Sequence, residues 1–208
     1  MAMFASYWGK PLDQGQQATF VRCGFALLTN TIALVLALRA VRNLWMIYVF
    51  TPIAAALALW ALASWQRTAL AALWFRLLIP LLGVAWVAIV LTIEDMQTFS
   101  LLAEPFAGLL VLGAAIYTLV ARTIMDLSRP MRSAWFWIGI GLAISSAGSI
   151  ALPPAANWLI RRHPELVMRA YEIKAILEAA AYAAIAWGMT CRSPVGGERE
   201  AVFAMRRE

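Results

Sequence analysis

Five polar or ionisable side chains lie deep within apolar stretches of this 208-residue sequence, where each must be paired or hydrated. They are Asn30, Arg76, Glu104, Lys174 and Glu178. A charge at the centre of a bilayer costs about 2.5–3.5 kcal/mol even on a lenient insertion scale. Carboxylates beside cations in such surroundings can exchange protons or bind ions and polar solutes. These residues are therefore the first candidates for chemistry.

The segments that must position these side chains are six stretches with few charges: 18–38, 44–64, 70–92, 99–121, 133–153 and 168–190. Each is close to the 20 or so residues that cross a hydrocarbon core of roughly 30 Å. Charged residues make up 13% of the chain, against about 25% in soluble domains. We predict an all-α polytopic integral membrane protein with a bundle of six transmembrane helices. Residues 1–192 should form this single domain, and residues 193–208 a short cytoplasmic tail.

Depth along the predicted helices separates the polar side chains into two layers. Counted from the expected cytoplasmic flank, Arg76 and Asn30 lie roughly 12–13 Å deep and Glu178 about 21 Å deep, within reach of Arg76 if a helix tilts. Glu104 and Lys174 both lie near 27 Å, by the same count of about 1.5 Å per residue, closer to the outer interface.

Two hypotheses fit these layers. In the first, Glu178 exchanges between Arg76 and a transported ion or solute, and Glu104 lies at the outer mouth of the path. In the second, a permanent ion pair between Arg76 and Glu178 fixes helix packing, while Glu104 and Lys174 extend toward the lipid head groups.

Basic residues predict the orientation, because Lys and Arg are retained on the cytoplasmic side during insertion. They are more numerous on the side of the N-terminus, so both termini should be cytoplasmic in a multi-pass protein of the cell inner membrane. A basic cluster at Arg161, Arg162 and His163 opposes this assignment. The N-terminal region does not have the pattern of a cleaved signal peptide, so we expect the first stretch to be a span.

Small residues recur every four positions in the fifth stretch, at Gly141, Ser145 and Ser149. Such a face lets another helix approach closely. The sixth stretch has a similar face, formed by Ala175, Ala179, Ala183 and Ala186. We predict direct contact between these two helices. The alternative is that the small-residue face of the fifth helix binds a protein partner.

Prolines predict where the helices bend or end. Pro52, Pro80 and Pro105 lie inside predicted helices, where proline removes a backbone hydrogen bond. A kink at Pro105 beside Glu104 would be a plausible binding feature, since freed carbonyls are tolerated where they line a wet cavity. The pair Pro153 and Pro154 is expected to end the fifth helix.

Several function classes are excluded or disfavoured by composition. His163 is the single histidine, so bis-histidine haem and multi-histidine metal sites are excluded. Motifs for serine hydrolases, zinc proteases, nucleotides and dinucleotides are absent, and no cofactor is expected. The net charge of +6 comes from residues that flank apolar segments, which favours lipid head groups over nucleic acid. Cys23 and Cys191 lack redox-motif spacing and should be reduced.

The sequence therefore favours a membrane protein that handles a small solute or ion, as a transporter or channel, through the five polar residues. The alternative is a non-transporting scaffold, sensor or accessory subunit whose charges serve only packing. An enzyme is disfavoured, because it would have to use Glu104 or Glu178 as its acid or base. Water-accessible, titratable Glu178 would favour the path, and tolerance of joint neutralisation of the pair would favour the scaffold.

Overall fold

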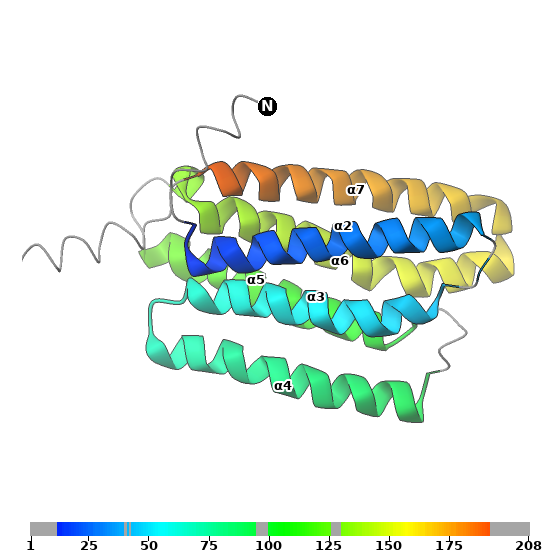
Figure 1. The fold of residues 1–208 in the computed structure, drawn as a ribbon, viewed down its shortest axis with the longest axis horizontal. Coiled ribbons are helices and arrows are strands. Elements are labelled where there is room, and N and C mark those ends of the chain that lie inside the picture. Colours follow the sequence, from blue (N-terminus) through cyan, green and yellow to red (C-terminus); the bar gives the residue numbers. More distant parts are fainter. Residues whose placement is uncertain (1–11, 40, 42, 95–99, 126–129, 192–208) are drawn as a thin grey trace, which may run out of the picture.

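The computed structural model describes residues 12–39, 41, 43–94, 100–125 and 130–191. Within them the fold is all-α, as predicted: six long helices run up and down along one axis (Figure 1). The helices are α2 (Gln14–Leu38), α3 (Trp45–Ser64), α4 (Ala69–Thr92), α5 (Ala103–Met125), α6 (Ala134–Arg162) and α7 (Pro164–Thr190), with a short 3-10 turn, η1 (Pro130–Arg132), before α6.

Five of these helices, α2 to α6, are long and apolar enough to cross a membrane. This supports the prediction of a membrane protein. Helix α7 has a similar length but carries Arg169, Glu172, Lys174 and Glu178 in its first half, and it is not among the five. Insertion of the bundle and the sixth span therefore stay predictions.

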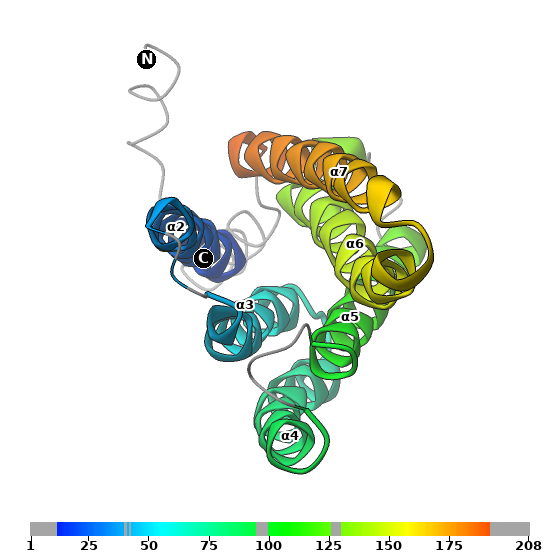
Figure 2. The same cartoon turned by 90° about the vertical axis from the view of Figure 1, so that its right-hand side faces the viewer.

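The helices form an open arrangement when they are seen along the bundle axis (Figure 2). Helix α3 packs against α2, α4 and α5, while α6 packs between α5 and α7. Helices α4 and α7 lie at opposite extremes of the bundle. Helix α2 packs mainly on α3. Helices α2 and α7 therefore lie on either side of a space that α3, α5 and α6 also border.

Glycines allow the close packing of α6 against its two neighbours. A Cβ added at Gly141 of α6 would lie 2.6 Å from the Ala181 carbonyl oxygen of α7, and one added at Gly188 of α7 would lie 2.7 Å from Ile138. On the other side, a Cβ at Gly108 of α5 would lie 2.9 Å from Ile150. The predicted contact between the fifth and sixth segments is confirmed.

Proline has different effects in α3 and α5. Pro52 lacks the N–H that would bond the Tyr48 carbonyl one turn earlier, and that carbonyl accepts a hydrogen bond from the Trp86 indole N–H of α4 at 3.0 Å. The predicted kink at Pro105 is wrong. Helix α5 begins at Ala103, so Pro105 lies in the first turn, where no backbone hydrogen bond is lost.

The prediction that the fifth helix ends at Pro153 and Pro154 is also wrong. Helix α6 continues through both prolines to Arg162. Proline has a helical φ, and its cost is the hydrogen bond to the carbonyl four residues earlier, which for Pro153 is that of Ser149. His163 is then the single residue between α6 and α7.

Candidate functional site

A cavity of about 380 Å³ lies among α2, α3, α5, α6 and α7. Apolar and polar side chains both line it. The larger polar side chains that its helices contribute are Arg22 and Asn30 of α2, Glu104 of α5, and Lys174, Glu178 and Tyr182 of α7. Hydroxyl groups of α6 add further polar surface. The cavity therefore brings together four of the five residues predicted from the sequence.

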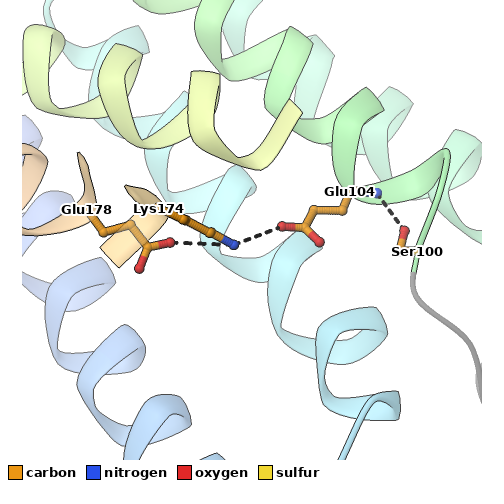
Figure 3. Close-up of polar contacts among 4 residues, drawn as sticks. All are labelled: Ser100, Glu104, Lys174 and Glu178. Carbon is orange, nitrogen blue, oxygen red and sulfur yellow. Dashed lines mark hydrogen bonds and ion pairs between the residues drawn. The ribbon is translucent and has the colours of Figure 1, made fainter. Parts of the chain in front are cut away.

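An ion cluster of three side chains lies along one wall (Figure 3). The Lys174 ammonium is 3.7 Å from a Glu104 carboxylate oxygen and 3.6 Å from one of Glu178. Lys174 and Glu178 are one helical turn apart on α7, whereas Glu104 comes from α5. The side chains of Glu104, Lys174 and Glu178 are 13%, 22% and 37% exposed, so Glu178 is the most accessible member.

The start of α5 holds Glu104 in place. Its backbone N–H donates to the Ser100 hydroxyl at 2.9 Å, as Figure 3 shows. The Glu94 carboxylate accepts from Ser100 and from the N–H groups of Leu102 and Ala103, and so caps the helix. Both carboxylates lie at the N-terminal end of α5.

Arg22 is the functional candidate that the sequence analysis missed. Its Nε and Nη1 atoms are buried and have no hydrogen-bond partner, and the side chain lines the cavity. Tyr182 of α7 lies within electrostatic range of both Arg22 and Glu178. The position of Arg22 inside the apolar stretch 18–38 is the signal that could have identified it.

The predicted pairing of Arg76 with Glu178 is corrected. Arg76 lies on α4, on an exposed surface, with its guanidinium carbon 5.3 Å from the centre of the Trp60 ring. It does not line the cavity, and the ion pair that the structure gives Glu178 is with Lys174. Depth along a helix gave no information about which side of the bundle each residue faces.

The small residues of α6 have two different roles. Gly141 packs directly on α7, whereas Ser145 and Ser149 line the cavity. Ser149 lies close enough to Glu104 to form a hydrogen bond with its carboxylate. The hydroxyl face thus belongs to the cavity wall. Binding of a protein partner there stays an untested prediction.

Side-chain hydrogen bonds join the helices at the end of the bundle where α2 starts and α7 ends. We call this the closed end. Asp13 caps α2 through Gln16, and its second carboxylate oxygen accepts from the Trp65 indole N–H at 3.1 Å. The Gln16 side chain donates to the Cys191 carbonyl at 3.3 Å. The Arg122 Nε donates to the Trp65 carbonyl at 2.6 Å.

Tight packing adds to this closed end. Trp65 is 1% exposed, and a Cβ added at Gly15 would lie 2.3 Å from its ring. Gln66 donates to the Thr118 hydroxyl at 2.8 Å, which joins the end of α3 to α5. Together these contacts leave α2, α3, α5 and α7 fastened to one another at this end.

Other reactive side chains lie apart from the cavity's polar wall. Cys23 and Cys191 are free thiols that pack on the hydrophobic core, and burial raises the pKa of the Cys191 thiol. His163 lies 3.3 Å from Glu165 and is half exposed. Among the residues that the structure describes, no group of three potential ligands could hold a metal ion.

Comparison of the chain with protein-family models, with curated proteins and with solved structures gives no match. Function must therefore be argued from the cavity itself.

Proposed function

We propose that this protein is a multi-pass membrane protein that binds a small polar solute or ion in the cavity and moves it across the bilayer. The observation that carries this proposal is the combination of size and charge: a space of about 380 Å³, lined by two cations and two carboxylates, in a bundle whose helices α2 to α6 are apolar enough to cross a membrane. We place it in the cell inner membrane, with α7 as the sixth span.

The ion cluster is suited to exchange. One Lys174 ammonium serves two carboxylates at nearly equal distances, so Glu178 can turn to a cargo while Glu104 keeps the lysine neutralised. A structural ion pair repays its desolvation only when the geometry is good and further hydrogen bonds satisfy both partners. The partial exposure of Glu178 and the open space beside it support a binding role instead.

The two ends of the cavity differ. Asn43 and Leu44, at the turn between α2 and α3, line it at one end, while the contacts around Trp65 close the other. With both termini in the cytoplasm, we expect this form to open toward the outside. Transport then requires a second form in which the contacts around Trp65 separate.

Thiol accessibility tests the proposal. In a Cys23→Ala, Cys191→Ala background, Ser149→Cys places a thiol at the cavity wall, and Leu142→Cys places one in the buried core of the same helix. In sealed vesicles, we expect a membrane-impermeant maleimide to label Ser149→Cys from the outer side and to leave Leu142→Cys unlabelled. If neither thiol reacts from either side, the cavity is dry and the proposal fails.

Movement of the cargo needs a further observation at the closed end. Thr118 is fully buried there and bonded to Gln66. We expect Thr118→Cys to react slowly from the cytoplasmic side, at a rate that changes with bound solute, because the closed end must open during transport. A thiol that never reacts would favour a receptor or scaffold over a transporter.

A further inference from the structure

We propose that the cargo is a small zwitterion, with its anionic group bound by Arg22 and its primary ammonium bound by Glu178. This inference deepens the proposed function and rests on it. The two groups line the same cavity from opposite helices, Arg22 from α2 and Glu178 from α7.

The anionic half of the ligand is indicated by Arg22. A buried guanidinium with unpartnered N–H groups loses hydration without recovering it from the protein. Nε and Nη1 of Arg22 are such groups. The guanidinium as a whole holds its N–H donors in fixed forks that match the two oxygens of a carboxylate or phosphate. An anion beside Arg22, where this side chain lines the cavity, would therefore compensate its charge.

The cationic half is indicated by the ion cluster. Glu104 and Glu178 share the single ammonium of Lys174, which leaves one negative charge in excess on that wall. Glu178 is the more exposed of the two carboxylates. Arg22 and Glu178 line the same cavity, so one ligand that spans it can place its ammonium at Glu178 and its anionic group at Arg22.

The charge balance of the whole cavity favours a ligand with both signs. Its two cations, Arg22 and Lys174, balance its two carboxylates, Glu104 and Glu178. A simple anion would leave the acidic wall in excess, and a simple amine would leave Arg22 unpartnered. An uncharged solute could form hydrogen bonds with both groups but would compensate neither charge.

Ligand-induced stabilisation of the purified full chain in detergent tests this inference, because a ligand that binds only the folded state raises the melting temperature. The probes are glycine, β-alanine and 4-aminobutyrate, compared with acetate and methylammonium at equal concentration and ionic strength. We expect at least one zwitterion to raise the melting temperature in a saturable way, and both single-charge probes to have little effect.

Two variants test which residue binds each charged group of the ligand. Arg22→Met and Glu178→Gln should each weaken binding of the active zwitterion on the order of 10–100-fold, as expected for a lost hydrogen bond to a charged group. Arg76→Met is the matched control, since it removes a cation outside the cavity and should leave binding unchanged. Equal binding by wild type and Arg22→Met would overturn the inference.

The same charge pair occurs in the head group of an aminophospholipid. Adding phosphatidylethanolamine or phosphatidylcholine to the micelles separates this source from a free amino acid. Stabilisation by the first lipid alone, lost in Arg22→Met and Glu178→Gln, would keep the zwitterion chemistry with a lipid source. Stabilisation by acetate or methylammonium alone would reject the zwitterion while preserving a solute cavity, whereas failed maleimide labelling at Ser149→Cys rejects the cavity itself.

Discussion

The two halves of the bundle differ in how their polar groups are arranged. At the closed end, Asp13, Trp65 and Arg122 form hydrogen bonds that join the ends of several helices, although the buried indole N–H of Trp135 has no partner there. In the other half, the ion cluster and Arg22 line the cavity, and Arg22 keeps buried N–H groups without partners. Hydrogen bonds between helices are thus concentrated at one end, and charged side chains around the cavity in the other half.

Burial follows the same division. The buried residues of α2 are confined to its first turns, Gly15 to Thr19, and those of α7 to its last third, Ala181 to Gly188. Beyond these regions both helices are mostly exposed. Their side chains are therefore most enclosed near the closed end, although α7 also packs along α6.

The largest expected effect belongs to the ion cluster. Lys174→Met should destabilise the protein by about 3 kcal/mol, because it leaves two facing carboxylates without their shared cation. Unfolding by SDS titration in detergent measures the change. Adding Glu104→Gln should recover part of the loss. An unchanged stability in the single variant would contradict the view that Lys174 neutralises this wall.

The second prediction concerns packing at the closed end. Gly15→Ala should cost about 1–3 kcal/mol, because the new methyl group meets the buried Trp65 ring. Gly24→Ala, in the same helix but with open space around it, should instead stabilise by up to about 1 kcal/mol through helix propensity. The difference in unfolding free energy between these variants isolates the contact. Equal values would mean that α2 is not held by Trp65.

Two substitutions at Asp13 distinguish the contribution of helix capping from that of the hydrogen bond to α3. Asp13→Ala removes both and should destabilise by about 1–2 kcal/mol. Asp13→Ser retains an N-cap oxygen but loses the carboxylate that accepts from Trp65, so it should recover roughly half of that loss. The same unfolding measurement applies. If serine restores full stability, the bond to Trp65 contributes nothing.

The smallest effect should have the opposite sign. Arg22→Met should stabilise the ligand-free protein by about 1 kcal/mol, since an apolar side chain of similar length replaces buried, unpartnered N–H groups. Loss of ligand-induced stabilisation should accompany this gain. Destabilisation of the ligand-free protein would indicate that Arg22 has a structural role and would weaken the contrast between the two halves.

Local patterns predicted much of the fold. Apolar length located the six long helices within about four residues at each end, except that α6 continues nine residues past its expected end. The spacing of Gly141 correctly predicted contact between α6 and α7. Glu104 and Lys174 were placed at the same depth, and the structure pairs them. These features depend on the rise per residue of a helix and on side-chain size, and both can be obtained from a single sequence.

The errors arose where rotation and lateral position mattered. Arg76 and Glu178 have compatible depths, but α4 and α7 lie at opposite extremes of the bundle (Figure 2). The order of helices around the axis depends on many weak contacts between segments, which no single-sequence pattern encodes. Pro153 and Pro154 were interpreted by local propensity alone, yet packing of α6 between α5 and α7 continues the helix past them.

The polar first half of α7 has a consequence for how the chain is made. A helix carrying Lys174 and Glu178 partitions poorly into lipid by itself, while the earlier helices α2 to α6 satisfy the length and hydropathy of membrane spans. Glu104 of α5 supplies a counter-ion for Lys174. We therefore expect α7 to enter the bilayer last, together with helices already synthesised, and loss of Glu104 to reduce its co-translational insertion.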